Sequence, residues 1–458
     1  MIAICRSDMA QDVCGLSARA DFVVLGGGIA GVSCAQTLRL LAPDTASIIL
    51  VTASEVVKAV TELTHMTKLL SSFSVTERDA GEWQQENAGV RLVKGIVTGV
   101  DKREKVVRVN GGGELRYDKL CICTGGQPRV ITRNNPRVLG IRDTQSVIHF
   151  QELLKDAARV MVVGNGGIAT EIVYELDNVD VVWAIKDSSI SSVFVDAGAG
   201  EFLTQKLRKN SDHDDKIEKP TKRIKYSVDK SGNAGFTGSA LGPDWHKGFS
   251  TDGKASGKSV KIEYKVEIEK ILTPEEFKSL NLGEHQMNNE ESDKTWNVYV
   301  KLSSGRVYGC DLVISATGVS PTGDLYRDVV EVDTEGGVVV DHNMVTSDPD
   351  IYAAGDICSA SWEPSEHWMQ MRLWTQARQM GIMAARAMVA HTQGEQIQLD
   401  FCFEMFAHVT RFFDFKVVLL GLFNGQKLDN DYEVLLRVTP GVEYIKVITK
   451  LFMQYEFY

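Results

Sequence analysis

The sequence predicts an α/β protein built on two separate parallel β-sheets, because one local pattern occurs in it twice. Each copy has a short apolar run typical of a buried strand, then a glycine-rich turn, then a segment with helical periodicity. The first copy starts at Asp21 and the second at Val160. A chain of 458 residues is long enough for two or three domains.

The first turn carries Gly26, Gly28 and Gly31, which complete the pattern G-x-G-x-x-G after the strand Phe22–Leu25. In this pattern the first glycine permits a tight turn, the second lets backbone approach a pyrophosphate, and the third lets helix and strand pack closely. Phosphates would bind the unpaired N–H groups at the positive end of the following helix, Ile29–Leu41. We therefore expect a dinucleotide here. The alternative is a glycine-rich turn without a ligand.

The second turn carries Gly164, Gly166 and Ala169 after the apolar run Val160–Val163. One such pattern can arise by chance, but two in the same context predict two Rossmann-like units and two dinucleotides. We expect one dinucleotide to be held tightly and the other to exchange. The strand Val179–Ile185 should follow the second helix.

The segments between the two turns complete the first sheet. We expect a strand at Ser47–Thr52, a polar helical segment around Thr61–Phe73, an antiparallel meander over Val90–Val100 and Val106–Val109, and a returning strand at Tyr117–Thr124. An acidic residue at the end of the second strand would bind a ribose. Here the strand ends in Thr52, and the nearest acid is Glu55.

Two further segments repeat a form seen earlier in the chain. Asp311–Pro321 has the same order as Leu120–Pro128, namely a strand, Thr-Gly and then a proline. Asp350–Asp356 is a short strand that ends in Gly-Asp, and the helical stretch Met371–Ala390 follows it. A carboxylate at the carboxyl end of a parallel strand can accept hydrogen bonds from sugar or ribityl hydroxyls.

From Asp21 to about Ala390 the chain resembles the pyridine nucleotide–disulfide oxidoreductases, flavoproteins with two dinucleotide-binding domains. The resemblance implies that Gly26, Gly28 and Gly31 bind the FAD pyrophosphate, and that Gly355 and Asp356 bind the ribityl chain. It implies that Gly164, Gly166 and Ala169 bind NAD(P)H. The turns Thr124-Gly125 and Thr317-Gly318 would bind cofactor and mark the chain crossings between the two domains.

The same resemblance divides the chain into parts. It implies a discontinuous FAD-binding domain (20–128 and 310–395), with the NAD(P)H-binding domain (129–309) inserted into it. Residues 396–458 resemble the start of the family's C-terminal dimerisation domain, with strands at 416–421, 432–438 and 444–449. We expect this short α+β domain to be truncated, and the oligomeric state stays open.

The chain departs from the family at its cysteines. Disulfide reductases of the family carry a cysteine pair after the second strand, but Ser54–Leu70 contains no cysteine, and the chain has no C-x-x-C. The family's C-terminal His-Pro…Glu pair has no counterpart either. We therefore expect an NAD(P)H-dependent FAD oxidoreductase whose electron acceptor is open. The alternative is a flavin redox sensor or protector that binds a partner protein when reduced, with little turnover.

Lys58 and Glu171 are the candidate catalytic residues. By resemblance, Lys58 lies where the family often supplies a cation near flavin N5, and Glu171 where it places a glutamate near the flavin edge. The cation would stabilise the anionic reduced flavin, and the glutamate would position the cation. The alternative is two unrelated solvated side chains. For the nicotinamide cofactor, Lys186 would favour a 2′-phosphate and Asp187 a free ribose hydroxyl, so NADH and NADPH both stay open.

Composition bounds the partners. A net charge of −11 argues against a nucleic-acid binder, and no apolar run approaches the ~20 residues of a membrane span. The 8 cysteines form no zinc-like cluster, so we expect no metal and a reducing compartment, the cytosol or nucleus. Residues 206–261 hold 13 Lys and Arg against 7 Asp and Glu. This basic segment, with Leu241, Pro243 and Trp245, is either a tolerated insertion or a docking arm for a protein partner.

Overall fold

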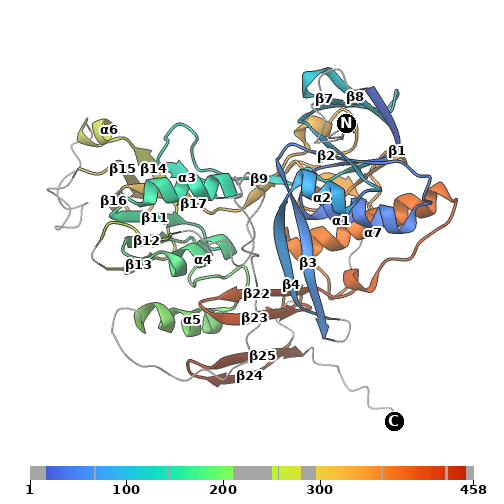
Figure 1. The fold of residues 1–458 in the computed structure, drawn as a ribbon. Coiled ribbons are helices and arrows are strands. Elements are labelled where there is room, and N and C mark those ends of the chain that lie inside the picture. Colours follow the sequence, from blue (N-terminus) through green and yellow to red (C-terminus); the bar gives the residue numbers. More distant parts are fainter. Residues whose placement is uncertain are drawn as a thin grey trace, which may run out of the picture.

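The chain forms two lobes, each built on its own parallel sheet (Figure 1). The structure is a computed structural model, and it describes residues 17–66, 69–141, 144–209, 250–255, 257–279, 295–362, 365–428 and 432–449. Two short antiparallel strands, β9 (Gly126–Pro128) and β18 (Val319–Pro321), pair where the chain passes between the lobes.

The sheet of the first lobe has seven strands in the order β5-β2-β1-β8-β7-β6, with β20 paired to β8. Strands β5, β2, β1, β8 and β20 are parallel, and β8, β7 and β6 form an antiparallel extension. Their bounds are β1 (Ser17–Leu25), β2 (Ile48–Thr52), β5 (Arg91–Lys94), β6 (Val97–Asp101), β7 (Val106–Val109), β8 (Gly113–Ile122) and β20 (Ile351–Ala353). The predicted meander is thus only partly right, because Arg91–Lys94 joins the parallel part of the sheet beside β2.

Helices α1 (Ile29–Leu41) and α7 (Trp374–Thr392) lie side by side in the first lobe (Figure 1). Their backbones approach closely at Gly381, where a Cβ atom would lie 2.2 Å from the carbonyl oxygen of Ala30. Burial of their apolar faces against the sheet stabilises both helices more than helix propensity alone would. The short helix α2 (Ala80–Glu86) precedes β5 and is capped by the Asp79 carboxylate. Close packing of α1 and α7 brings the start of α7 toward the first glycine turn.

The second lobe has a five-stranded parallel sheet in the order β10-β17-β11-β12-β13 and a three-stranded antiparallel sheet β14-β15-β16. The strands are β10 (Val138–Leu139), β11 (Arg159–Val163), β12 (Asp180–Ala184), β13 (Ser259–Glu263), β14 (Ile268–Leu272), β15 (Val298–Leu302), β16 (Val307–Cys310) and β17 (Leu312–Ser315). Its helices are α3 (Thr144–Leu154), α4 (Gly167–Glu175), α5 (Ala197–Lys209) and α6 (Pro274–Ser279). The repeated strand–turn–helix pattern therefore forms two α/β units, as the sequence predicted.

The helix predicted around Thr61–Phe73 is wrong. The chain forms an antiparallel hairpin instead, with β3 at Val56–Met66 and β4 at Leu69–Asp79. β-Branched residues flank this segment, with Val56, Val57 and Val60 before it and Val75 after it. Such side chains lose rotamer freedom in a helix and favour a strand, which outweighs the helical spacing of the polar residues.

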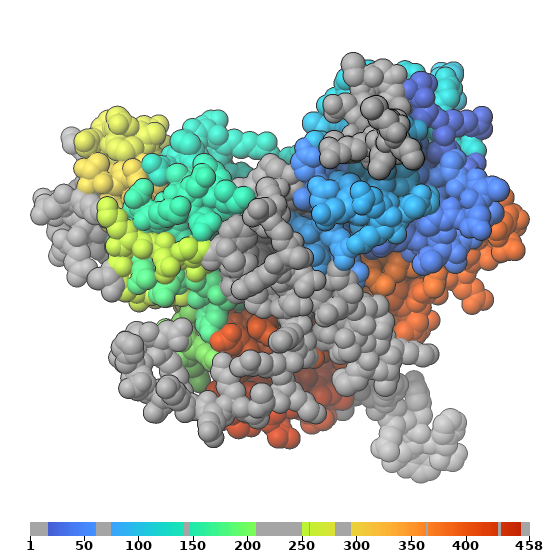
Figure 2. Space-filling view, viewed as in Figure 1, coloured from blue at the N-terminus to red at the C-terminus, as the bar shows by residue number. Residues whose placement is uncertain are grey.

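The strands after α7 form two hairpins at the base of the second lobe, β22 (Ala407–Phe412) with β23 (Phe415–Leu420) and β24 (Glu433–Thr439) with β25 (Glu443–Thr449) (Figures 1 and 2). The Tyr174 hydroxyl of α4 donates to the Asp414 carboxylate at 2.8 Å, and the Tyr444 hydroxyl donates to Asp196 at 2.9 Å. Strand β22 also contacts β4 of the first lobe, so the C-terminal strands touch both lobes. Three of these strands were predicted, and β22 was not.

Candidate dinucleotide sites

The first glycine turn connects β1 to α1 and leaves no room for side chains at two of its glycines. Gly26 has φ +119°, and a Cβ atom there would lie 2.3 Å from the carbonyl oxygen of Cys123. A Cβ atom at Gly31 would lie 1.9 Å from the carbonyl oxygen of Gly26. The turn conformation and the contact between helix and strand therefore require glycine at both positions.

Gly28 is different, because neither its conformation nor its protein neighbours require glycine. Its φ of −76° and ψ of −179° are extended backbone that any residue adopts. A Cβ atom there would meet nothing within 4 Å. The missing side chain leaves open space in front of the first N–H groups of α1, which have no partner within the helix. That space and the positive end of the helix dipole suit a pyrophosphate.

The second turn, between β11 and α4, has the same construction. Gly164 has φ +127°, and its Cβ atom would lie 2.2 Å from the carbonyl oxygen of Ala316. Gly166 has φ −88° and ψ −174°, and its Cβ atom would meet nothing within 4 Å. Ala169 is fully buried against the lobe. The open space again lies at the amino end of a helix.

The two Thr-Gly turns follow the residues on which the first glycines pack. Thr124-Gly125 comes directly after Cys123, and Thr317-Gly318 comes directly after Ala316. Gly125 and Gly318 have φ values of +70° and +96°, and the strands that follow them are β9 and β18. Each turn thus ends a parallel strand beside a glycine turn and leads into the paired segments that join the lobes.

The Gly-Asp turn after β20 lies beside the beginning of α1. Gly355 has φ +86°, and a Cβ atom there would lie 2.8 Å from the Cβ atom of Ala30. This contact places Asp356 at the carboxyl end of the parallel sheet, next to the first glycine turn. The Asp356 side chain is partly exposed, and its carbonyl oxygen accepts a hydrogen bond from Arg372 Nε at 3.1 Å.

Lys58, on β3, also lies beside the first glycine turn, at the carboxyl end of the parallel strands. Its N–H donates to the carbonyl oxygen of Gly27 at 2.9 Å, which ties the strand to the glycine turn. Its ammonium is buried, with 4% of the side chain exposed, and lies 3.5 Å from a carboxylate oxygen of Glu77 on β4. The ammonium also lies 4.5 Å from the ring centroid of Trp374, the first residue of α7. The structure thus buries a positive charge beside the turn and surrounds it with a carboxylate and an aromatic face.

Glu77 and Trp374 are the residues at this edge that the sequence did not reveal. Glu77 is directly opposite Lys58 in the β3–β4 ladder, a pairing that exists only because the segment is a hairpin. Glu171 lies on α4 in the second lobe, four residues after Gly167, and is partly buried. The predicted pairing of Lys58 with Glu171 stays a prediction.

A sequence profile of the family described as pyridine nucleotide-disulphide oxidoreductase matches residues 20–213 and 279–381. The chain belongs to this family. It is 47% identical over 443 residues to pyridine nucleotide-disulfide oxidoreductase domain-containing protein 1 of Mus musculus, with 93% of this chain and 88% of that protein covered. It is 45% identical over 440 residues to the Homo sapiens protein of that name, with the same shares covered.

Solved structures of other oxidoreductases have the same fold. A NAD-dependent persulfide reductase from A. fulgidus gives a TM-score of 0.62 at 19% identity, covering 94% of this chain and 71% of its own. A water-forming NADH oxidase from Lactobacillus brevis gives 0.61 at 16% identity, covering 94% and 83%. At these identities the likeness shows the fold alone. Membership of the family shows a pyridine-nucleotide-dependent oxidoreductase of the two-domain flavoprotein class, in agreement with the two glycine turns.

The disulphide in the family name raises the question of reactive cysteines. In the described part of the chain all cysteines are free, and five of the six are buried. The sulfur atoms of Cys121 and Cys123 lie 3.5 Å apart behind the first turn. Their contact, together with burial, raises the pKa of Cys123 well above the usual thiol value. A buried, protonated thiol is a poor nucleophile, so this arrangement activates neither sulfur atom.

The described residues include no group of three His, Cys, Asp or Glu side chains arranged to bind a metal ion. Among them, no helix is both long and apolar enough to cross a membrane. The predicted basic segment 206–261 falls mostly outside the described residues, which end at 209 and resume at 250. Leu241, Pro243 and Trp245 therefore lie outside the described residues.

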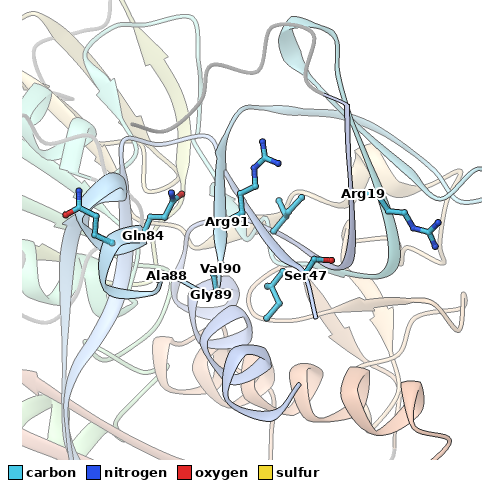
Figure 3. A pocket seen from close by; sticks show the side chains of 10 residues that line it. Arg19, Ser47, Gln84, Ala88, Gly89, Val90 and Arg91 are labelled. Carbon is cyan, nitrogen blue, oxygen red and sulfur yellow. The ribbon is translucent and has the colours of Figure 1, made fainter. Parts of the chain in front are cut away.

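A cavity of about 510 Å³ opens at the amino end of the parallel strands of the first sheet (Figure 3). Its lining includes Arg19 of β1, Ser47 just before β2 and Arg91 at the start of β5. These residues lie where the parallel strands begin, whereas both glycine turns and Lys58 lie where strands end. Arg19 is paired with Asp118 at 2.9 Å. The cavity is therefore separate from the predicted dinucleotide site, since ligands of such sheets bind at the carboxyl ends of the strands.

Proposed function

We propose that this protein is an FAD-dependent oxidoreductase that takes hydride from NAD(P)H, with FAD in the first lobe and the nicotinamide dinucleotide in the second. The observation that carries the proposal is the pair Gly28 and Gly166. Both have ordinary extended backbone and open space at the Cβ position, so nothing within the protein requires glycine there. What sets both apart from other open glycines is their place, directly before a helix that follows a parallel strand, where a ligand pyrophosphate close to the backbone would supply the reason.

The residues around the first turn suit a flavin dinucleotide. N–H groups at the start of α1 would bind its pyrophosphate, and the Asp356 carboxylate would accept hydrogen bonds from ribityl hydroxyls. Buried Lys58 would supply positive charge beside the reactive ring, where the low dielectric strengthens its effect. Glu171, on the helix that follows the second turn, would contribute a carboxylate from the nicotinamide side. A flavin bound here would supply hydride acceptance.

No cysteine pair among the described residues restricts the acceptor to a disulfide. The electron acceptor therefore stays open among dioxygen, a quinone-like molecule and a partner protein. The alternative role, a redox sensor that binds a partner when reduced, uses the same two sites. The proposed location is the cytosol or nucleus.

The first experiment is the visible spectrum of the purified protein, followed by anaerobic titration with NADH and NADPH. A flavin spectrum that bleaches on titration supports both sites, and absence of flavin after reconstitution with FAD contradicts the proposal. Rapid reoxidation by added acceptors supports turnover. A long-lived reduced complex with a broad long-wavelength band supports the sensor role instead.

Single methyl groups then test each site. Gly28→Ala should keep the fold and lose flavin, whereas Gly166→Ala should keep flavin and lose bleaching by NAD(P)H. Gly99→Ala on β6 is the matched control, because its Cβ atom would also meet nothing within 4 Å but lies away from both turns. If both turn variants hold as much flavin as the control and are reduced by NAD(P)H in the same way, the proposed sites are wrong.

A further inference from the structure

The loop after β12 carries two opposite signals for the choice between NADH and NADPH. Lys186 and Asp187 follow the strand two and three residues after its last residue, Ala184. A carboxylate at this place accepts hydrogen bonds from ribose hydroxyls and repels a 2′-phosphate. A lysine at this place attracts the phosphate. The sequence cannot rank them, but the surroundings of the two side chains can.

Asp187 is bound to the second glycine turn itself. Asn165 stands between Gly164 and Gly166, and its Nδ2 donates to Asp187 Oδ2 at 2.8 Å. The same amide nitrogen lies 2.9 Å from both the Ser189 carbonyl oxygen and Ser192 Oγ, so its two hydrogens are shared among three acceptors. Asn165 is 7% exposed, so these hydrogen bonds are largely shielded from water.

A second set of contacts fixes the loop that holds Asp187. Asn165 Oδ1 accepts a hydrogen bond from the Ser191 N–H at 2.5 Å. Ser191 is fully buried, has φ +54°, and its hydroxyl lies 2.8 Å from the Thr170 hydroxyl of α4. A non-glycine residue in the left-handed region persists only when its surroundings hold it there. The loop from 187 to 192 is therefore anchored to both the turn and the helix.

The two charged side chains differ in how firmly they are placed. Lys186 is exposed, and an ammonium on a flexible four-carbon stem is well hydrated and loosely placed. Asp187 is half-buried and held through Oδ2, and its Oδ1 makes no hydrogen bond within the described residues. A fixed carboxylate with a remaining acceptor oxygen can bind a ribose hydroxyl at little further cost in entropy.

We propose that Asp187, positioned by Asn165, makes this protein select NADH over NADPH. The inference rests on the proposed function, because it assumes that the second turn binds the pyrophosphate. A hydrogen bond to a charged group strengthens binding by roughly 10- to 100-fold. We therefore expect binding of the dinucleotide without the 2′-phosphate to be about 10- to 100-fold tighter. Asp187 is the specificity-determining residue, and Asn165 is a positioning residue.

The test measures dissociation constants of NAD+ and NADP+ for the oxidised flavoprotein by calorimetry, so that no turnover is needed. Asp187→Ala should weaken NAD+ and strengthen NADP+, which brings their ratio close to one. Asn165→Ala should lower the ratio by a smaller factor at unchanged flavin content, an effect that a purely structural role would not produce. Lys186→Ala tests the opposite signal and should change the ratio by no more than about twofold, because the lysine is exposed. If Asp187→Ala fails to retain flavin, the isosteric Asp187→Asn removes the charge with less disturbance.

Three outcomes would overturn the inference and leave the proposed function intact. The first is a wild-type protein that binds NADP+ as tightly as NAD+, and the second is a ratio that Asp187→Ala leaves unchanged. The third is a loss of NADP+ binding in Lys186→Ala, which would make the lysine the determinant. Failure of both nucleotides to bind a flavin-loaded protein would contradict the second site of the proposed function, and the inference with it.

Discussion

Replacing Glu77 with glutamine tests whether the buried charge beside the first turn depends on its partner across the hairpin. The side chain keeps its shape but loses the charge that lies 3.5 Å from the Lys58 ammonium. Removing one partner of a fully buried ion pair costs about 3–5 kcal/mol, because the other charge stays buried without compensation. Here the Glu77 side chain is 19% exposed, and the Trp374 ring remains near the ammonium.

Both features reduce the expected loss. Partial exposure lets water solvate the site, and a cation over an aromatic face retains about 0.5–2 kcal/mol. We therefore expect Glu77→Gln to destabilise the first lobe by about 1–3 kcal/mol. The control is Glu269→Gln, which breaks a cross-strand pair with Lys301 at 2.8 Å whose side chains are 50% and 28% exposed. An exposed pair of this kind should cost only ~0–1 kcal/mol.

The assay is urea unfolding of the two variants in parallel with the wild type, followed by tryptophan fluorescence. Because the chain has two lobes, the transitions are assigned with FAD present and absent, since only the lobe that binds FAD should shift. The double variant Lys58→Met with Glu77→Leu should be more stable than Glu77→Gln alone, because it removes the buried ammonium together with the carboxylate beside it. Equal stability of Glu77→Gln and Glu269→Gln would refute the reasoning.

Three further predictions concern the core around the sites. Gly31→Ala should destabilise the first lobe by at least the ~1–3 kcal/mol of an overpacked core, since its Cβ atom would lie 1.9 Å from the Gly26 carbonyl oxygen. With flavin removed from all proteins, Gly28→Ala should unfold like the wild type, because its Cβ atom meets nothing within 4 Å. Because they are buried, Cys121 and Cys123 should resist iodoacetamide at pH 8 in the native protein and react in urea, which mass spectrometry would show. Labelling of the native protein would mean that the core around these two cysteines opens. Burial lowers the pKa of His408 from 6.5 to about 4, so the folded state binds fewer protons than the unfolded state between these values. The free energy of unfolding should then fall by on the order of 3 kcal/mol as pH drops from about 6.5 to 4. Denaturant titrations of His408→Phe should show a smaller dependence on pH, and an unchanged dependence would contradict the assignment to His408.

The sequence predicted both glycine turns because their requirements are local. A strand, a turn and a helix follow one another within about twenty residues, and each glycine has a reason that can be stated from the pattern alone. It also predicted the Gly-Asp turn at Gly355 and Asp356, since the strand before it is short and apolar. The structure adds what the pattern could not give, namely that Gly28 and Gly166 face open space.

The sequence failed where the structure depends on partners far apart in the chain. Glu77 lies across a hairpin from Lys58, and the pairing appears only when β3 and β4 are placed in register. Trp374 reaches the same ammonium from α7, some three hundred residues further along the chain. No local spacing carries such information. Asn165 was missed for a related reason, because a polar residue between two glycines shows its role only when the loop from 187 to 192 is in place.

The two turns have the same construction, yet the strands beside them end differently. In the second lobe the strand is followed by Asp187, which Asn165 of the glycine turn holds and which we propose to bind a ribose. In the first lobe the corresponding strand ends in Thr52, which is buried, and a Cβ atom on Gly27 would lie 2.5 Å from its hydroxyl oxygen. The nearest acid, Glu55, is paired with Lys94. The end of this strand therefore supports the turn, and in the proposed site the additional contact to a dinucleotide would come from the Gly-Asp turn that follows β20. When ligand contacts come from two segments far apart in the chain, the contacts of both must break before the ligand dissociates. Such a site suits a cofactor that stays bound. In the second lobe the proposed ligand contacts, the turn at Gly166 and the loop at Asp187, lie about twenty residues apart in neighbouring elements, which suits a nucleotide that exchanges at every turnover.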